Sequence, residues 1–277
     1  MTVQRIGEIM SIETASADAR RTPAEPRPAG TILLLRDVPE YQVLMVRRHH
    51  QIDFASGALV FPGGKMHPGD DDPRWRDHVT GWDEIDATQR ALRIGAIREA
   101  FEEAGILLAN YPDGRGFSSV CDAEARRKVD TGELAFLDVV AGLGVKLSLT
   151  ALTVFARWIT PEMMPKRFDT WFYAAPAPAD QVAICDGHET VDAEWIAPES
   201  VLDLARSGAR TVIFPTLMNV KLLAEAESAA DCLARAEARP LVTVLPQIET
   251  RDGERVLTIP LDAGYGEVTQ SLTELRA

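Results

Sequence analysis

Short apolar runs separated by turn-forming residues dominate the first part of the chain after residue 28. The runs at 31–35 (TILLL) and 41–47 (YQVLMVR) flank the turn RDVPE and predict two strands of a hairpin. A third run at 58–61 (ALVF) ends in Pro62-Gly63-Gly64 and predicts another short strand. Residues 1–28 have little hydrophobic periodicity and are rich in Ala, Pro, Arg and Glu, so we expect a flexible lead-in there.

The segment 87–104 gives the strongest helical signal in the chain. At ~100° of rotation per residue, Ile94, Ile97, Phe101 and Ala104 fall on one side, which should face a sheet. Gly105 follows at the position where many helices end in a left-handed residue. The pattern therefore predicts an amphipathic helix that ends at Ala104.

The rest of the chain mixes further helices with further strands. Residues 65–86 are polar and contain several loop-forming residues, and the acidic run 70–72 within them indicates a solvated loop. Because hairpins mix with helices without regular βαβ alternation, we expect an α+β fold, specifically an α/β/α sandwich with a mixed sheet and helical insertions. The pattern predicts helices at 122–141, 198–207 and 214–230 and strands at 147–159, 167–174, 193–196, 241–248 and 255–260.

Composition and charge narrow the classes of partner. The chain has 46% hydrophobic and 26% charged residues and a net charge of −13, which argues against nucleic acid or an anionic membrane as the main partner. Cys121, Cys185 and Cys232 are widely spaced without a Cys-x-x-Cys pair, which favours a reducing compartment such as the cytoplasm. No apolar run reaches membrane-spanning length, and none follows Arg20 and Arg21, so we expect neither a spanning helix nor a secretory signal.

The other side of the predicted helix carries the candidate chemistry. Glu99 and Glu103 lie one turn apart with Glu102 close to both, and carboxylates at this spacing repel unless a positive charge lies between them. Magnesium suits such a group, because it takes carboxylate and water oxygens together with substrate phosphates. The alternative is a solvated helix face without function. That alternative leaves unexplained the Gly63-Gly64 turn, which permits close approach of the backbone to a ligand or metal.

These residues resemble the Nudix box. Gly64 is followed after five residues by Asp70, and residues 98–106 (REAFEEAGI) match the second half of the box at every fixed position. There are two departures from the family pattern: Asp70 stands where the family has Glu, and 27 residues rather than seven separate it from Arg98. Whether the shorter Asp70 makes the family's contact with Arg98 therefore stays open.

The interruption of the box is similar to that in a Nudix branch that includes peroxisomal coenzyme A diphosphatases. The stretches PAGTILLLRD, SGALVFPGGKM and ARWITPEMMPKRFDTWFYA also resemble that branch, and the resemblance spans about residues 28–265. It implies a single Nudix domain over 29–265 with insertions at about 71–90 and 120–146, followed by a tail over 266–277. A homodimer is a further possibility, because dimers are common in the family.

The resemblance implies a metal-dependent hydrolysis of a diphosphate. In the family, box carboxylates hold Mg²⁺ or Mn²⁺, and here these are Glu99, Glu102 and Glu103, oriented by Arg98. A backbone carbonyl near Gly63 or Gly64 is a further possible ligand. Many members add a carboxylate from a distant loop as base or ligand, for which Glu189 is the first candidate, Glu194 the second, with assistance from His188 as an option.

Basic residues outside the box are candidates for substrate contacts. Arg47, Arg48, His49 and His50 either touch a phosphate, such as the 3′-phosphate of coenzyme A, or form an exposed strand end of mixed charge. Arg167 either reaches the substrate or pairs with an acid such as Asp169. The aromatic side chains that follow it, Phe168, Trp171 and Phe172, fit a core better than a base-stacking platform.

Three functions compete. The first is hydrolysis of coenzyme A or acyl-coenzyme A to 3′,5′-ADP and a 4′-phosphopantetheine product. The second is a Nudix diphosphatase for ADP-ribose, NADH, a nucleotide sugar or a dinucleoside polyphosphate, since fold does not fix specificity. The third is a non-catalytic nucleotide sensor, which the retention of all three box carboxylates disfavours.

Overall fold

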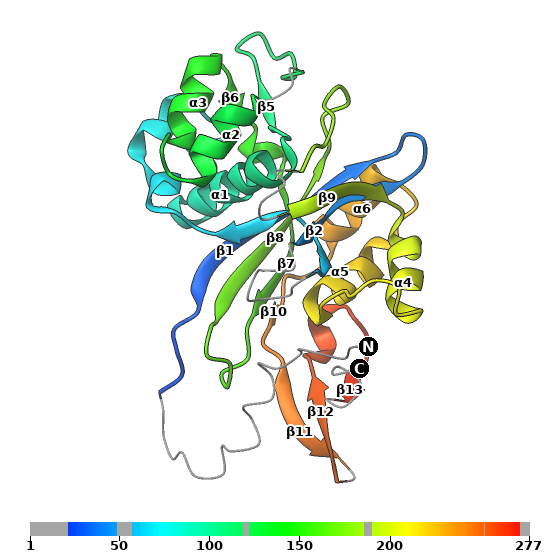
Figure 1. Cartoon of the computed structure of the whole chain (residues 1–277). Helices are drawn as coiled ribbons and strands as arrows, with labels where there is room; N and C mark the ends of the chain where they lie inside the picture. Colours follow the sequence, from blue (N-terminus) through cyan, green and yellow to red (C-terminus); the bar gives the residue numbers. More distant parts are fainter. Residues whose placement is uncertain (1–21, 49–56, 119–121, 186–189, 252, 272–277) are drawn as a thin grey trace.

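A computed structural model describes residues 22–48, 57–118, 122–185, 190–251 and 253–271 (Figure 1). Its helices are α1 (Ala87–Ala104), α2 (Ala123–Asp130), α3 (Phe136–Leu143), α4 (Pro198–Arg206), α5 (Phe214–Leu223) and α6 (Ala229–Ala238), with the short 3₁₀ helices η2 (Pro68–Asp71), η3 (Pro73–Asp77), η4 (Leu149–Ala151) and η5 (Leu261–Ala263). Its strands are β1 (Arg27–Arg36), β2 (Gln42–Arg48), β3 (Leu59–Val60), β4 (Gly63–Lys65), β5 (Ala109–Asn110), β6 (Lys146–Leu147), β7 (Thr153–Ile159), β8 (Phe168–Pro176), β9 (Thr190–Ile196), β10 (Thr243–Val244), β11 (Gln247–Arg251), β12 (Glu254–Thr258) and β13 (Thr269–Ser271).

A mixed eight-stranded sheet is the centre of the molecule. Its strand order is β10-β7-β8-β1-β2-β3, with β4 paired to β1 and β9 paired to β2. Strands β1 and β8 are parallel, whereas β1 pairs antiparallel with both β2 and β4. Strand β2 pairs only with the last residues of β1, so the first half of β1 can pair with β4. This division brings the Gly63-Gly64 turn into the middle of the sheet.

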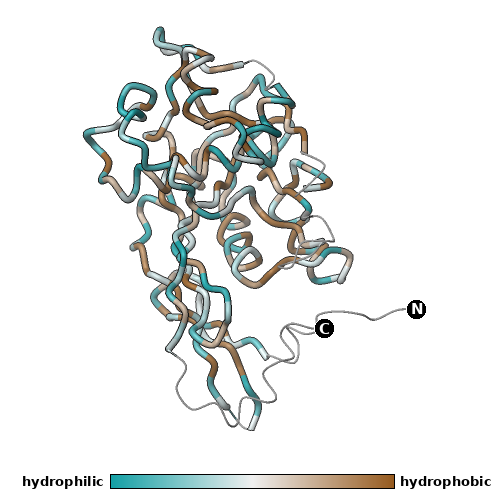
Figure 2. Tube along the Cα trace, turned by 60° about the vertical axis from the view of Figure 1, so that its left-hand side comes forward, coloured by the Kyte–Doolittle hydropathy of each residue, from teal (hydrophilic) through white to brown (hydrophobic). Residues whose placement is uncertain are grey.

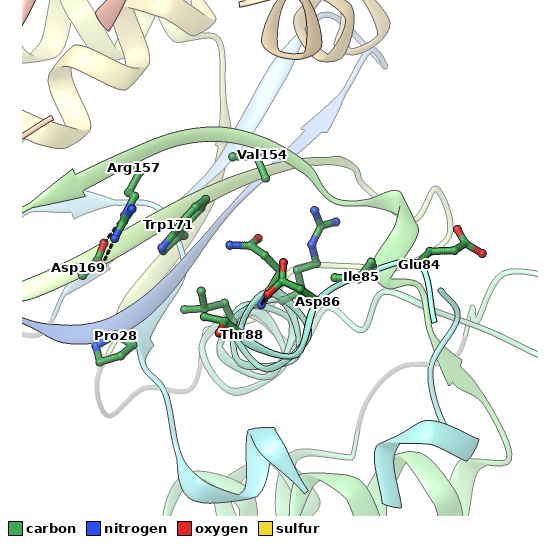
Figure 3. A pocket seen from close by; sticks show the side chains of 12 residues that line it. Pro28, Glu84, Ile85, Asp86, Thr88, Val154, Arg157, Asp169 and Trp171 are labelled. Atoms are coloured by element: carbon green, nitrogen blue, oxygen red, sulfur yellow. Dashed lines mark hydrogen bonds and ion pairs between the residues drawn. The ribbon is translucent and has the colours of Figure 1, made fainter. Parts of the chain in front are cut away.

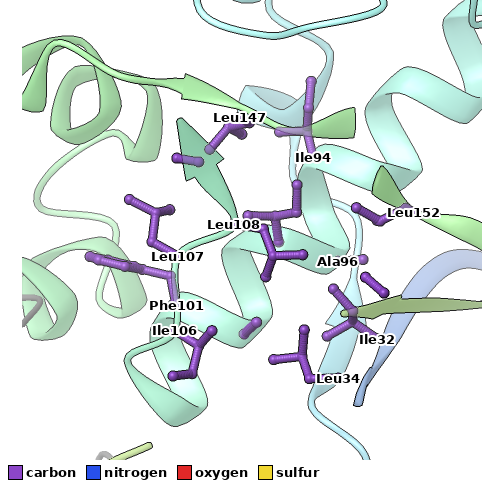
Figure 4. Close-up of a cluster of buried hydrophobic side chains, with 14 of the residues drawn as sticks. Ile32, Leu34, Ile94, Ala96, Phe101, Ile106, Leu107, Leu108, Leu147 and Leu152 are labelled. Carbon is purple, nitrogen blue, oxygen red and sulfur yellow. The ribbon is translucent and has the colours of Figure 1, made fainter. Parts of the chain in front are cut away.

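Each face of the sheet is covered by a different group of helices. Alternation along β1 sends Ile32 and Leu34 into a core shared with α1, α2 and α3, and Leu33 and Leu35 into a core shared with α4, α5 and α6. Figure 1 shows the two helical groups on either side of the strands, and Figure 4 shows the first core around Ile94 and Phe101. Hydrophobic stretches accordingly run through the middle of the molecule (Figure 2). The predicted α/β/α sandwich with a mixed sheet is confirmed.

A separate three-stranded sheet, β11-β12-β13, extends away from this body (Figures 1 and 2). Its β11–β12 hairpin turns at Gly253, which has a φ of 84° that favours glycine. None of the described helices has the length and apolar character needed to cross a bilayer.

Several elements differ from the sequence prediction. The stretch predicted as one strand over 147–159 is β6, η4 and β7, and the helix predicted over 214–230 is two helices. The break in that helix occurs because Ser228 caps α6, its hydroxyl accepting from the Asp231 amide at 3.1 Å. The polar stretch 65–86 contains two 3₁₀ helices, and Trp75 is buried there against Phe136.

Glycine is required where β1 passes under α1. A Cβ atom at Gly30 would lie 2.7 Å from the carbonyl oxygen of Leu92 and 3.2 Å from Cβ of Ala96. These contacts are with backbone and a rigid methyl group, so neither can move aside cheaply. Gly30 thus sets the closest distance between the sheet and the box helix.

We therefore predict opposite effects for two glycine-to-alanine changes. Gly30→Ala should lower the free energy of unfolding by about 1–3 kcal/mol through overpacking. Gly142→Ala in α3, where a Cβ would meet nothing within 4 Å, should raise it by about 0.5–1 kcal/mol. Urea denaturation of both variants measures the difference, and a neutral Gly30→Ala would contradict the close approach.

Candidate active site

Helix α1 begins and ends as its sequence predicts, but its acidic side is not in water. The Asp86 carboxylate accepts from the Gln89 amide at 3.0 Å, and Gly105 closes the helix with a φ of 70°. Exposed fractions are 7% for Glu99, 7% for Glu102 and 4% for Glu103. The alternative of a solvated surface helix is therefore wrong, since burial of three carboxylates demands compensating charge or hydrogen bonds.

Arg98 is the buried cation that links these acids. Its Nη1 donates to Glu99 at 2.9 Å and to Glu102 at 2.8 Å, and its Nη2 donates to the carbonyl oxygen of Lys65 at 2.8 Å. Burial alone would lower the pKa of Arg98, but the field of Glu99 and the hydrogen bonds to Asp70 raise it above its usual value. The guanidinium therefore stays charged and ties α1 to β4.

Asp70 makes the contact with Arg98 that its short side chain left open. Its two carboxylate oxygens accept from Nε of Arg98 at 2.9 Å and from Nη2 at 3.2 Å. One of them also accepts from the His67 amide at 2.8 Å. Asp70 is 2% exposed, so the prediction that residues 70–72 form a solvated loop is wrong for this residue. Asp is one methylene shorter than the Glu of the family pattern. Because Asp70 lies in η2, its backbone is close enough to Arg98 for the shorter side chain to reach it.

The Gly63-Gly64 turn packs directly against the box carboxylates. The Gly63 amide donates to Oε2 of Glu103 at 3.0 Å. A Cβ atom at Gly64 would lie 2.4–2.7 Å from the carboxylate atoms of Glu99, so a side chain there would displace this carboxylate from its place beside Arg98. The sequence argument for close backbone approach at this turn thus agrees with the geometry: the two glycines leave room for the carboxylates.

One buried oxygen in the cluster lacks a partner. Oε1 of Glu102 has no hydrogen-bond partner among the described residues, although Oε2 binds Arg98. Burial raises the pKa of Glu102 to about 8, against the lowering effect of Arg98. A charged Glu102 therefore needs a further positive group at this oxygen.

The box residues fit a divalent cation, because a Glu102 oxygen needs a positive partner. Three buried carboxylates, those of Asp70, Glu99 and Glu102, contact the single guanidinium of Arg98, and one Glu102 oxygen has no hydrogen-bond partner among the described residues. A hard cation that accepts carboxylate oxygens would give that oxygen a partner. Within the described residues, no three His, Cys, Asp or Glu side chains are already gathered as a metal site, and Arg98 pairs with both Glu99 and Glu102.

A residue that sequence reasoning missed holds the end of the box helix. Arg126 of α2 is buried and donates to the carbonyl oxygens of Phe101 and Glu102 at 2.9 Å each, and to that of Ile184 at 2.8 Å. A cation at a helix C-terminus satisfies carbonyls that lack partners in the helix. No pattern in the sequence singles out this arginine, because its targets are backbone atoms.

The structure places two other candidates away from the carboxylates. Arg47 lies across from Leu59, and Glu194 lies across from Met45; both partners belong to the core on the far face of the sheet from α1. Arg47 is 3.8 Å from Asp192. Neither the substrate contact proposed for Arg47 nor the second-choice base Glu194 is brought to the box helix.

Arg167 is a structural residue in this arrangement. It is buried, and it donates to the carbonyl oxygens of Thr160 at 3.0 Å and Ala24 at 2.8 Å. The alternative that it pairs with Asp169 is wrong, since Arg157 lies 2.6 Å from that carboxylate. Arg167 therefore closes the turn between β7 and β8 rather than facing the Glu cluster.

The remaining candidates cannot be placed in the same way. Glu189, His188, His49 and His50 lie outside the described residues, as does the side chain of Arg48. Thr190, which follows Glu189, is buried and its hydroxyl donates to the carbonyl oxygen of Glu103 at 3.1 Å. The role of Glu189 stays a prediction.

A groove of about 650 Å³ lies beside the N-terminal half of α1 (Figure 3). Thr88, Gln89 and Leu92 form its helix side, and Arg157, Asp169 and Trp171 form its sheet side (Figure 3). Trp171 is half-buried at this groove, with the Arg157 guanidinium 4.8 Å from its ring centre. Trp171 also packs against the core on the α1 side, as the sequence predicts, but its position beside a groove could not be read from periodicity.

Comparison with known proteins agrees with this geometry. A mixed sheet between two helical layers, with the box carboxylates on the helix that crosses it, is the arrangement of a Nudix protein. This chain belongs to the Nudix family described as the NUDT19 Nudix domain, whose family model matches residues 82–223. The matched part contains the whole of α1, whereas Gly63, Gly64 and Asp70 precede it.

Individual relatives are similar at modest identity. The acyl-coenzyme A diphosphatase NUDT19 of Xenopus laevis is 25% identical, over 59% of this chain and 54% of the frog protein. The human protein of that name is 26% identical, over 95% of this chain and 79% of its own length. The crystal structure of a Nudix hydrolase from Alicyclobacillus acidocaldarius is 26% identical with a TM-score of 0.68, covering 76% of this chain and 96% of that one. The chain thus spans about half the length of the frog relative.

The Asp70–Arg98 pair should dominate the stability of the site. Asp70→Ala should lower the free energy of unfolding by about 1–3 kcal/mol, because buried donors of Arg98 and the His67 amide lose their acceptor while Glu99 and Glu102 still pair with Arg98. Asp71→Ala is the matched control, since Asp71 is the exposed neighbour on the same 3₁₀ helix and should change little. Urea denaturation compares the two, and equal small effects would refute the role of Asp70.

Glu102 should make the metal-free protein less stable as pH rises. Burial raises its folded pKa from 4.5 to about 8, so between these values the folded state keeps a proton that the unfolded state loses. Stability is then highest below pH 4.5 for this group and falls as pH rises toward 8. Glu102→Gln should remove that part of the decline. Unfolding midpoints across this window in EDTA measure it, and an unchanged slope would count against the raised pKa.

Proposed function

We propose that this chain is a divalent-metal-dependent diphosphatase that hydrolyses coenzyme A or acyl-coenzyme A. The products are 3′,5′-ADP and a 4′-phosphopantetheine compound. The observation that carries the proposal is the buried cluster of box carboxylates around Arg98, with one Glu102 oxygen left without a partner. The substrate class rests on the similarity to the frog and human proteins named acyl-coenzyme A diphosphatase.

Three side chains would hold the cation, Mg²⁺ or Mn²⁺. These are Glu99, Glu102 and Glu103, all from the last two turns of one helix and all buried. When bound, such an ion neutralises the diphosphate and lowers the pKa of a water molecule. The chain's own part is to fix the carboxylates: Arg98 orients Glu99 and Glu102, and the Gly63 amide orients Glu103.

The reaction needs an attacking water, a proton acceptor and a leaving phosphate. The water oxygen forms a bond to one phosphorus, the anhydride P–O bond breaks, and the bridging oxygen leaves with the other phosphate. A carboxylate takes the proton of the water, a role for which Glu189 is the predicted residue. No covalent link to the protein is needed, in keeping with a site made of carboxylates rather than a nucleophile and its base.

The net charge, the cysteines and the family resemblance support proposals for the partner, the compartment and the assembly of this protein. The net charge of −13 fits a small-molecule substrate brought in with a cation better than nucleic acid or an anionic membrane. Cys185 and Cys232 are free thiols, which fits a reducing compartment such as the cytoplasm. A homodimer is the assembly that the family resemblance favours.

The box carboxylates are tested by one isosteric change and one control. Glu103→Gln should lower kcat by about 10²–10³-fold, the usual cost of removing one charge-stabilising group from a preorganised site. Glu199→Gln, which changes an exposed acid at the start of α4, should leave turnover unchanged. Purified proteins are assayed with Mg²⁺, Mn²⁺ or EDTA, and products are identified by mass.

The substrate is tested with the same proteins on a panel. Coenzyme A and acetyl-coenzyme A should release 3′,5′-ADP faster than ADP-ribose, NADH, UDP-glucose or a diadenosine polyphosphate is cleaved. Faster cleavage of another compound, still dependent on Glu103, would keep the metal chemistry and exclude the coenzyme A assignment. Turnover that survives both EDTA and Glu103→Gln would overturn the proposed mechanism.

A further inference from the structure

The groove beside α1 lies in line with the carboxylate cluster. On a helix, Thr88, Leu92 and Glu99 fall along one stripe, because each step of four or seven residues returns near the same angle. Thr88 and Leu92 line the groove, and Glu99 contacts Gly64. Glu99 is seven positions after Leu92, a rise of about 10 Å along the helix.

The sheet gives the same distance independently. Trp171 of β8 is in register with Gly30 of β1, and Gly30 is in register with Gly64 of β4. Two strand spacings of about 4.8 Å therefore separate the backbone of Trp171 from that of Gly64, or about 10 Å. A molecule whose diphosphate lies at the carboxylates would place a neighbouring part in the groove.

The charged side chains that line the groove do not favour binding of the substrate's 3′-phosphate. Its two guanidinium groups are already engaged: Arg157 binds both oxygens of Asp169 at 2.8 and 2.6 Å, and Arg93 donates to the carbonyl oxygens of Leu149 and Leu152. Glu84 and Asp86 lie at its rim, and among the described residues neither forms an ion pair. The 3′-phosphate of an adenosine half would meet negative charge here.

The remaining lining suits a neutral chain that carries amides and methyl groups. Leu92, Val154 and the Trp171 ring supply apolar surface. The side-chain oxygen of Gln89, Oε1, accepts a hydrogen bond from the Tyr173 hydroxyl at 2.9 Å. The side-chain nitrogen of Gln89 therefore points in another direction and can donate to a ligand carbonyl. A volume of about 650 Å³ is ample for such a group.

We infer that this groove binds the uncharged pantetheine arm of the substrate, with Trp171 as its main contact, while the adenosine half lies outside it. The inference rests on the proposed function, because it assumes a substrate of the coenzyme A class. It assigns specificity to Trp171, Thr88 and Gln89, which are distinct from the carboxylates that carry the chemistry.

The two halves of the substrate distinguish this assignment from its alternatives. Titration calorimetry in Mg²⁺ measures the binding of 4′-phosphopantetheine and of 3′,5′-ADP separately. Trp171→Ala should weaken 4′-phosphopantetheine binding by about tenfold, the value of one lost aromatic contact with its buried area, and leave 3′,5′-ADP unchanged. Trp195→Ala is the matched control, because Trp195 also carries an arginine on its ring, that of Arg36, but lies outside the groove.

A second pair of variants keeps the subsite testable if Trp171→Ala does not fold. Thr88→Tyr fills the groove from an exposed helix position, and Ala87→Tyr adds the same ring at the next exposed position, which does not line it. Thr88→Tyr alone should weaken 4′-phosphopantetheine. With acetyl-coenzyme A as substrate, it should raise KM while kcat stays near that of the unaltered protein.

The outcomes separate the subsite from the function. If the groove variants weaken 3′,5′-ADP instead, or change neither ligand while coenzyme A is still cleaved, the arm assignment is overturned and the diphosphatase stands. If the protein cleaves no coenzyme A but Trp171→Ala and Thr88→Tyr still weaken 4′-phosphopantetheine, the groove assignment stands and the proposed reaction fails.

Discussion

The buried contact between Arg98 and its carboxylates is the interaction on which this structure depends. A single guanidinium holds Asp70, Glu99 and Glu102 and one backbone carbonyl, and nearly all of it is shielded from water. Burial of that many charges costs free energy unless each has a partner. The fold meets this demand by bringing η2, β4 and α1 to one point, so the chemistry-bearing side chains are fixed by the packing that stabilises the domain.

Close packing around α1 follows from the same requirement. Gly30 lets the sheet approach the helix, and Gly64 leaves room for the Glu99 carboxylate. Arg126 of α2 donates hydrogen bonds to the carbonyl oxygens at the C-terminus of α1. The segments before and after α1 therefore have a structural part in the site, since one carries Trp75, which packs against Phe136 of α3, and the other carries Arg126. The helix that carries the buried carboxylates is thus packed against the sheet, against β4 and against Arg126 of α2.

Helix α1 borders both the carboxylate cluster and the groove proposed to bind part of the substrate. Its C-terminal half carries the buried carboxylates, and its N-terminal half borders the groove with Trp171. Helical rise and strand spacing both place the two regions about 10 Å apart. The rigid sheet thus sets which part of a bound molecule can meet each region. Specificity can change through groove side chains while the carboxylate cluster stays as it is.

The sequence by itself determined the box helix, its closing glycine, the layered α/β/α class and the identity of the clustered acids. These are local properties, since periodicity, caps and spacing act within a few turns of chain. Only the tertiary structure decided that the acids are buried, that Asp70 reaches Arg98 across the 27 residues between them, and that Arg47 and Glu194 lie on the far face of the sheet. It also decided that Arg126 meets backbone carbonyls and that Trp171 borders a groove. Such contacts join segments far apart in the chain, and they depend on strand register and face, which no local pattern encodes.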